Sequence, residues 1–375
     1  MKLTPSLLDQ WLLQKHTAQP PIEFDLASNT GPVMTLHDII ALSDEDLLRE
    51  LLHTPVSYIS AAGSTELRNA IGQLQGVDGD AIQIVTGASE ALLIFCFLAA
   101  EPGANVVLPD LGYPSNTAIA ASLGLEVRLY RLRAEANFQL DVDQVAKLID
   151  RETRFLLVNS PNNPTGAVIG DSDMEILYQL CEERGVQFIS DEVYHPIFHG
   201  PPSQSAARFP NATVVGDLSK SLCLSGLRVG WIVDRNHGRI ERYNNARKYF
   251  TICNSPLGEK LATAAVRHSR KIYDQTLSTA AKNLALLEPV LATHSDLIRY
   301  RRPGGGMTAF PALVSGDDSR SFCLRLARRG VLVTPGDCFG RPGHFRVGFA
   351  ASGDRFSSAL ERFDYFLNTE SWNRR

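Results

Sequence analysis

The chain has 375 residues, of which 44% are hydrophobic, so it can bury a sizeable core and is long enough for two domains. Its 37 basic and 41 acidic residues are scattered and give a formal net charge of −4, which argues against a nucleic-acid partner. The longest apolar run, 91–100, is half a membrane span, and no two of the six cysteines have C-x-x-C spacing. We therefore expect no transmembrane helix, no metal site, no disulfide framework and a cytoplasmic location.

The first forty residues form an arm with four prolines and one short amphipathic helix, which the helical spacing of its apolar residues predicts. From residue 82 onward, short apolar runs recur, and helical stretches such as 90–99, 141–149 and 173–184 lie between most of them. The runs that we expect to be strands are 82–85, 106–108, 127–129, 155–158, 186–189, 213–215 and 229–233. This alternation predicts an α/β fold with a mostly parallel seven-stranded sheet, whose ligands bind at the carboxyl ends of the strands.

The alternation loosens after about residue 270. A long helical segment, 278–294, leads to the turn at 304–306, and a compact α/β region follows. We therefore divide the chain into an N-terminal arm (1–40), a large domain with the seven-stranded sheet (41–270) and a smaller C-terminal α/β domain (271–375), on which the arm packs.

Two candidate sites follow the first two strands. Residues 86–90 read T-G-A-S-E, and small residues that open a helix leave backbone N–H groups free to hold a phosphate. Gly87, Ala88 and Ser89 are the candidates there, although a plain turn capped by Ser89 would give the same string. Tyr113, in P-D-L-G-Y-P, could stack on an aromatic ligand or simply pack under its loop.

Two further motifs follow the central strands. In N-S-P-N-N-P-T-G (159–166), prolines and glycine make a turn of fixed shape that can direct Asn163 at a ligand oxygen. In S-D-E-V-Y (190–194), Asp191 could pair with a protonated pyridine nitrogen, and Tyr194 could donate to a phenolate oxygen. The plainer alternatives are a tight loop for the first motif and a helix N-cap for Asp191.

The segment 216–231 reads G-D-L-S-K-S-L-C-L-S-G-L-R-V-G-W. Lys220 follows a strand, small residues such as Ser219 surround it, and Arg228 comes eight residues later. A lysine in a crowded cationic site can form a Schiff base, and an arginine can grip a phosphate with two hydrogen bonds. Late in the chain, Arg346 of H-F-R-V-G-F could clamp a carboxylate in the same way. Taken singly, each of these residues could equally be an ordinary surface charge.

Together and in this order, the motifs resemble those of the class I/II aminotransferase superfamily, the fold type I enzymes that use pyridoxal 5′-phosphate (PLP). The likeness runs from Tyr58 to Arg346. It implies an enzyme that acts on an α-amino acid, with PLP held as a Schiff base on Lys220, which also moves protons.

The resemblance also implies a role for each other candidate. Asp191 and Tyr194 join Lys220 as catalytic residues, and Arg346 and Asn163 contact the substrate. The cofactor ligands that it implies are Gly87, Ala88, Ser89, Ser219 and Arg228 around the phosphate, Tyr113 for stacking, Asn163 and Tyr194 at the phenolate oxygen and Asp191 at the ring nitrogen. Tyr58 matches a tyrosine that reaches the phosphate from the neighbouring subunit, which implies a homodimer with shared active sites.

One position departs from the superfamily pattern. Asp217 stands three residues before Lys220, where many relatives carry a serine. The G-D-L-S-K form, the early helix and the segment 25–31 resemble a narrower branch, the capreomycidine synthase type of enzyme that cyclises hydroxylated arginine. That branch removes the α-proton, loses a side-chain hydroxyl and closes the guanidine onto the unsaturated carbon. A polar wall would have to hold the guanidinium, and Asp9 and Asn29 are the candidates, with Ser28 and Thr30 beside them.

Three functions therefore stand side by side. Ring closure on a hydroxyarginine, as in capreomycidine- and enduracididine-type cyclases of specialised metabolism, is the favoured hypothesis. Ordinary transamination between an amino acid and a 2-oxo acid needs the same cofactor residues and is the alternative. A non-catalytic sensor protein with this fold is the third, and the complete set of cofactor residues disfavours it.

Overall fold

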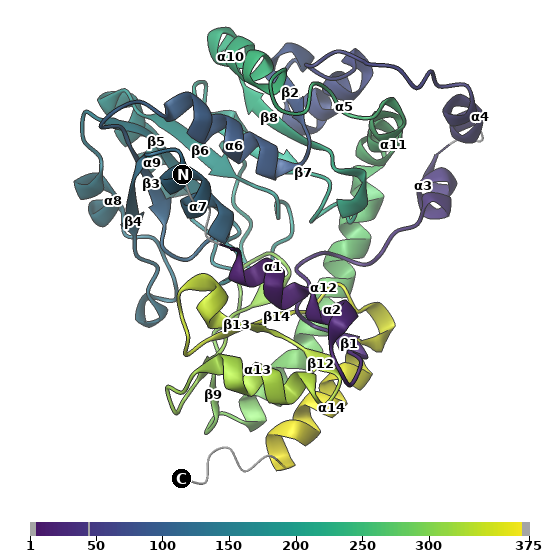
Figure 1. The fold of residues 1–375 in the computed structure, drawn as a ribbon, viewed down its shortest axis with the longest axis vertical. Helices are drawn as coiled ribbons and strands as arrows, with labels where there is room; N and C mark the ends of the chain where they lie inside the picture. The colour runs from purple at the N-terminus through teal and green to yellow at the C-terminus, as the bar shows by residue number, and fades with distance from the viewer. Residues whose placement is uncertain (1–4, 44–45, 370–375) are drawn as a thin grey trace.

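The computed structural model describes residues 5–43 and 46–369 (Figure 1). Its largest sheet has seven strands in the order β2-β8-β7-β6-β5-β3-β4, with β8 antiparallel to both neighbours and the other pairs parallel. The strands are β2 (Ile82–Val85), β3 (Asn105–Pro109), β4 (Glu126–Tyr130), β5 (Thr153–Asn159), β6 (Gln187–Asp191), β7 (Thr213–Asp217) and β8 (Gly230–Asp234). Each coincides with or overlaps a predicted apolar run, so the α/β fold with a mostly parallel seven-stranded sheet is confirmed.

The helices next to these strands in the sequence are α5 (Thr65–Gln75), α6 (Ala88–Ala99), α7 (Pro114–Ser122), α8 (Val142–Leu148), α9 (Asp171–Arg184), α10 (His237–Arg247) and α11 (Pro256–Arg267). Helices α6 to α9 lie between strands of this sheet, α5 precedes it, and α10 and α11 follow it, with α11 packed on α5. Short 3-10 turns lie at Gly79–Ala81, Ala134–Ala136, Ala206–Arg208, Ser225–Leu227, Gly336–Phe339 and Gly353–Arg355. Among the described helices, none is long and apolar enough to cross a membrane.

A long helix, α12 (Ser269–Thr293), runs from the sheet region into the C-terminal region (Figure 1). It begins nine residues before the predicted 278–294, because its first turns contain polar and charged residues that gave little apolar periodicity. The C-terminal region consists of β9 (Ile298–Arg299), β10 (Thr308–Ala309), β11 (Ala312–Leu313), α13 (Ser319–Ala327), β12 (Val331–Leu332), β13 (Thr334–Pro335), β14 (Phe345–Gly348) and α14 (Phe356–Thr369). The exact division at residues 40 and 270 stays a prediction.

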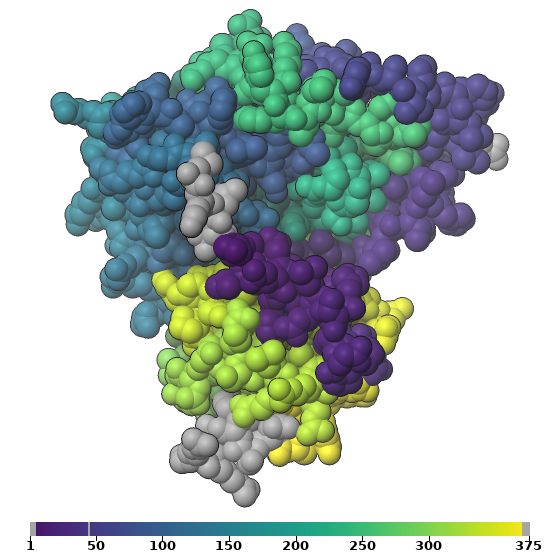
Figure 2. Space-filling view, viewed as in Figure 1, coloured from purple at the N-terminus to yellow at the C-terminus, as the bar shows by residue number. Residues whose placement is uncertain are grey.

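The N-terminal arm lies on the C-terminal region at its junction with the sheet region (Figure 2). It comprises α1 (Leu7–Leu12), α2 (Gln14–Thr17) and β1 (Phe24–Asp25), and α3 (Leu36–Leu42) and α4 (Asp46–Leu52) follow. β1 pairs in parallel with β12, and the indole Nε1 of buried Trp11 donates to the carbonyl of Val333 at 2.8 Å. These contacts fix an otherwise irregular segment against the end of the chain.

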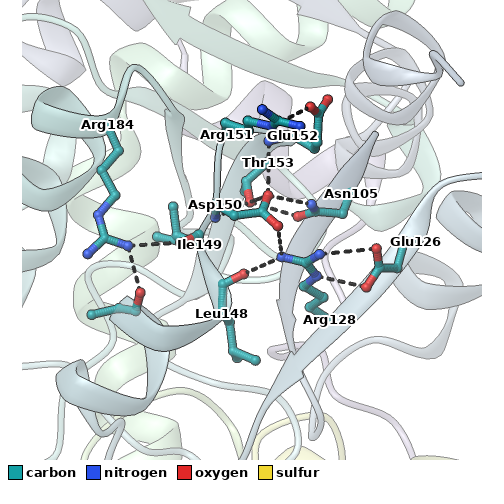
Figure 3. A network of polar contacts seen from close by, with 11 residues as sticks. Asn105, Glu126, Arg128, Leu148, Ile149, Asp150, Arg151, Glu152, Thr153 and Arg184 are labelled. Atoms are coloured by element: carbon teal, nitrogen blue, oxygen red, sulfur yellow. Dashed lines mark hydrogen bonds and ion pairs between the residues drawn. The ribbon is translucent and has the colours of Figure 1, made fainter. Parts of the chain in front are cut away.

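A polar network ties together the amino ends of three neighbouring strands, β4, β3 and β5 (Figure 3). The Asp150 carboxylate accepts from Asn105 Nδ2 at 2.9 Å and from Arg128 Nη1 at 2.6 Å, and Arg128 also pairs with Glu126. The Asn105 hydrogen bond and the Arg128 guanidinium hold the pKa of Asp150 well below its usual range. This edge of the sheet is therefore secured by local contacts, and the carboxyl ends of the strands are left for other groups.

Gly348 provides a test of how the arm is fixed. Its N–H donates to the carbonyl of Leu26 at 2.7 Å, and a Cβ at this position would overlap the carbonyl oxygen of Ser28. We predict that Gly348→Ala lowers the free energy of unfolding by about 1–3 kcal/mol, the usual cost of overpacking, in denaturant titrations. Gly343→Ala is the matched control, because a Cβ there meets open space. Equal stability of the two variants would contradict this packing.

Candidate active site

A pocket of about 250 Å³ lies at the carboxyl ends of β5, β6 and β7, between the first turn of α6, the arm and β14. Candidate residues from both ends of the chain meet there: Asp9, Asn29, Ala88, Ser89, Tyr113, Asn163, Asp191, Tyr194, Ser219, Lys220, Arg228 and Arg346. Gly87 does not line the pocket but directly precedes α6 beside it, and Tyr58 lies outside the pocket, with 83% of its surface exposed. Within the described residues, no cluster of His, Cys, Asp and Glu could hold a metal ion.

Lys220 lies in this pocket, and its Nζ donates a hydrogen bond to Asn29 Oδ1 at 2.9 Å. The pKa of Lys220 is lowered from 10.5 to about 8, chiefly because the surrounding protein removes water, and the cationic Arg346 and Arg228 act in the same direction. The Asp217 and Asp191 carboxylates oppose this shift. The amine is therefore available as a nucleophile at a pH at which an exposed lysine would be almost fully charged.

Asp191, the last residue of β6, is buried and accepts a hydrogen bond from the N–H of Val193 at 3.2 Å. The pKa of Asp191 is raised to about 7, chiefly by burial and in part by the negative charges of Asp217 and Glu192, while the Val193 hydrogen bond opposes the shift. A carboxylate in this setting is suited to a cationic partner such as a pyridinium N–H, which would keep it ionised. Glu192 does not line the pocket, and its Oε1 accepts from Ser190 Oγ and from the N–H of Ala206.

Arg346 is almost fully buried and joins three segments of the chain. Its Nη1 donates to Asn163 Oδ1 at 2.9 Å, and its Nη2 donates to the carbonyl of Ala27 at 2.7 Å. Its buried Nε has no hydrogen-bond partner among the described residues. Since an unpaired guanidinium N–H in a protein interior is costly, the site fits an anionic ligand such as a carboxylate.

The amino end of α6 and the Arg228 side chain together form a candidate anion-binding site. Gly87 precedes α6 with a φ of 76°, and no side chain caps the first turn, which leaves the N–H groups of Ala88 and Ser89 available. The positive φ of Gly87 explains the glycine, and a Cβ there would also overlap Nη2 of Arg228. Arg228 Nη1 donates to the carbonyl of Ser225 at 3.1 Å, and its second contact, with Ser219 Oγ, is long at 3.5 Å. The guanidinium is thus lightly held and can turn to a phosphate.

Seven residues that line the pocket were not predicted as site residues: Leu8, Leu12, Leu92, Asn159, Val193, Asp217 and Ser225. Asn159, at the end of β5, accepts from the N–H of Asn163 at 2.8 Å and donates to the carbonyl of Asp191, so it aligns two motifs. Its position in the N-S-P-N-N-P-T-G string was the available signal. Asp217 lines the pocket and accepts from the N–H of Ser219 at 2.9 Å. It therefore shapes the turn before Lys220 and adds negative charge there.

The residues present fit pyridoxal 5′-phosphate. The candidate anion-binding site at α6 suits its phosphate, the Asp191 carboxylate suits its ring nitrogen and the Lys220 amine suits its aldehyde. Burial raises the pKa of Tyr194, so its phenol keeps a proton at neutral pH that it can donate to the phenolate oxygen. The unpaired Nε of Arg346 remains for a substrate carboxylate.

Comparison with known proteins agrees with this geometry. The family model "Aminotransferase class I and II" matches residues 21–362. The chain is 29% identical to capreomycidine synthase of Streptomyces vinaceus over 374 residues, which cover 98% of this chain and 95% of that protein. A PLP-dependent aminotransferase from Streptococcus suis has a TM-score of 0.91 at 30% identity, and the PLP-dependent cyclase OrfR has 0.87 at 27%. Each of these two matches covers 98% of this chain and 98% of the matched chain.

The lowered pKa of Lys220 gives a direct prediction. In the cofactor-free protein, we expect the rate of acetylation of Lys220 by acetic anhydride to be half-maximal near pH 8, because only the neutral amine reacts. Quantitative mass spectrometry of the peptide that carries Lys220 measures this rate at each pH. A midpoint near 10.5, the ordinary value for lysine, would contradict the environment described for the amine.

Proposed function

The chain belongs to the aminotransferase class I and II family and uses pyridoxal 5′-phosphate, and from this premise we propose that it closes a guanidine ring on a hydroxylated arginine with loss of water. The observation that carries the proposal is the pocket wall from α1. Three residues of α1 line the pocket: Leu8 and Leu12 are apolar, and Asp9 contributes a carboxylate. Such a wall suits a long aliphatic side chain that ends in a guanidinium. The full-length similarity to capreomycidine synthase and to the cyclase OrfR supports the same reaction.

The proposed roles follow the chemistry of each side chain. When bound, pyridoxal phosphate supplies an electron sink for negative charge at the α-carbon. We assign the covalent hold on the cofactor and the transfer of the α-proton to Lys220, the ring-nitrogen contact to Asp191 and the substrate carboxylate to Arg346. The remaining cofactor contacts go to Gly87, Ala88, Ser89, Ser219 and Arg228 at the phosphate, Tyr113 at the ring face and Asn163 with Tyr194 at the phenolate oxygen.

The reaction balances without an oxidant or a second substrate. One proton leaves the α-carbon and later returns to it, the side-chain hydroxyl leaves as water with a second proton, and a guanidine nitrogen gives up a proton as it bonds to the carbon that has become electrophilic, so the net loss is one water. Lys220, whose pKa is about 8, can accept and return a proton near neutral pH. Asp9 and Asn29 border the space for the guanidinium, while Leu8 and Leu12 exclude water from one side of the pocket.

Transamination is the second candidate, and the similarity to the Streptococcus suis aminotransferase favours it. It would use the same cofactor residues and the same arginine for the substrate carboxylate. The two reactions differ in what they consume, because transamination needs a 2-oxo acid to recover the starting form of the enzyme. That difference, and not the geometry of the cofactor site, separates the two candidates.

We further propose a homodimer in which Tyr58 completes the site of the partner subunit. Tyr58 lies outside the pocket of its own chain, and the segment that contains it exposes several large apolar side chains. They are Leu36, Leu48, Leu52 and Val56, whose exposed fractions are 48–82%, and Tyr58 itself is 83% exposed. Several large exposed apolar side chains within one segment suit burial in a subunit interface.

The six unpaired cysteines suit a reducing compartment such as the cytoplasm.

The reaction type is tested by mass spectrometry of the PLP-loaded enzyme with β- and γ-hydroxyarginine, with and without pyruvate or 2-oxoglutarate. We expect a product lighter by one water without any keto acid, because elimination and ring closure consume no co-substrate. A product that forms only with the keto acid, together with the corresponding new amino acid, would establish transamination and contradict the cyclase proposal. Lys220→Ala is the control and should abolish either product.

Shared active sites are tested by complementation. We predict that Tyr58→Ala and Lys220→Ala are each nearly inactive, and that co-expression of the two restores about a quarter of wild-type activity, since half of the dimers then contain one intact site of two. Tyr365→Ala, which removes an exposed tyrosine on α14, is the control and should retain full activity. Failure of the mixed subunits to regain activity would contradict the shared-site dimer.

A further inference from the structure

The amide of Asn29 connects two of the proposed catalytic groups. Its Oδ1 accepts a hydrogen bond from Nζ of Lys220 at 2.9 Å, and its Nδ2 donates one to the Tyr194 hydroxyl at 2.6 Å. The orientation of the amide is determined by these partners. If the amide were rotated by 180°, its NH₂ group would face the charged amine of Lys220. Both groups would then be hydrogen-bond donors and neither could accept.

The backbone around Asn29 is held so that the amide stays in place. The Asp25 carboxylate accepts from the N–H groups of Ala27 at 2.9 Å and Ser28 at 3.0 Å, which fixes the turn before Asn29. After it, Gly31 lies so close to Cys223 that a Cβ would overlap the sulfur atom. The backbone is therefore fixed before Asn29 by the Asp25 carboxylate and after it by contact with the turn that carries Lys220.

The contact with Lys220 is specific to the free amine. Nζ donates to Asn29 only while it is not covalently engaged, which is the state in which a lysine can carry a proton for the reaction. The amide itself does not titrate, so it orients the amine without adding charge. The charged groups that face Lys220 are Asp217 on β7, Asp191 on β6, Arg346 on β14 and Arg228, and none of them has a hydrogen bond to Nζ in the described structure.

We propose that Asn29 is a positioning residue, which holds the released amine of Lys220 beside the Tyr194 hydroxyl and so keeps the proton carrier in place between steps. This role is additional to any contact between Asn29 and the substrate side chain. It rests on the part of the proposed function that concerns Lys220 and the cofactor, which both candidate reactions share. A finding of transamination in place of cyclisation would therefore leave it standing.

The first test measures Lys220 directly in the full-length, cofactor-free protein, by pH-dependent acetylation read out on the Lys220 peptide. Asn29→Asp replaces the amide by a carboxylate of the same shape, so it should raise the midpoint by about one pH unit or more. Asn29→Ala removes an acceptor that favours the charged form, so its midpoint should not rise. Circular dichroism confirms that each variant is folded before it is compared.

The second test separates positioning from substrate contact in the PLP-loaded enzyme. We expect Asn29→Ala to lower kcat on the order of tenfold to a hundredfold with KM nearly unchanged, because a misplaced proton carrier slows the step without weakening binding. A residue that only borders the substrate would instead raise KM and leave the Lys220 midpoint unchanged.

The chain contains a matched control on its surface. Asn245 Oδ1 accepts from Nζ of Lys248 at 3.1 Å, and both side chains are exposed. Asn245→Asp should leave the titration of Lys220 and both kinetic constants at wild-type values. If Asn29→Asp also left the Lys220 midpoint unchanged, or if Asn29→Ala retained wild-type kcat, the positioning role would be wrong.

Discussion

The rest of the structure depends on one electrostatic constraint, which is that a lysine amine must be kept reactive in a site poor in water. Lys220 and Asp191 have pKa values shifted toward each other, to about 8 and about 7, because burial opposes charge on both. Parallel strands supply the means, since their carboxyl ends bring residues from separate turns to one edge. At the amino ends of β3, β4 and β5, the network around Asp150 holds neighbouring strands together. The carboxyl ends of the strands are therefore left for the pocket residues.

The N-terminal arm has a chemical as well as a structural place in this account. Its backbone at Leu26 and Ala27 is held by Gly348 and Arg346 of the C-terminal region. From there the chain delivers Asn29 to Lys220, 191 residues away in sequence. The group proposed to bind the substrate carboxylate and the group proposed to orient the amine are thus coupled through one short, rigid segment. Such rigid support is what precise placement of a reacting group requires.

The sequence predicted well what depends on local patterns and less well what depends on the packing of distant segments. Buried strands were visible as apolar runs, but the antiparallel direction of β8 was not, because the same run suits either direction. Most of the pocket residues could be proposed because their motifs directly follow strands of the sheet. The contacts of Asn29 with Lys220 and Tyr194 carry no sequence signal, since they arise only when the arm folds back. Tyr58 could be given a role only by resemblance, because its partner would belong to a second chain.

The central claim is that Lys220 carries the cofactor, and one measurement tests it most directly. The PLP-loaded enzyme is reduced with sodium borohydride, which makes the lysine–cofactor bond permanent, and is then digested and analysed by mass spectrometry. The account predicts the mass of the reduced cofactor on the peptide that contains Lys220 and on no other lysine. Cofactor on another lysine, or on none, would contradict the site, the mechanism and the proposed role of Asn29 together.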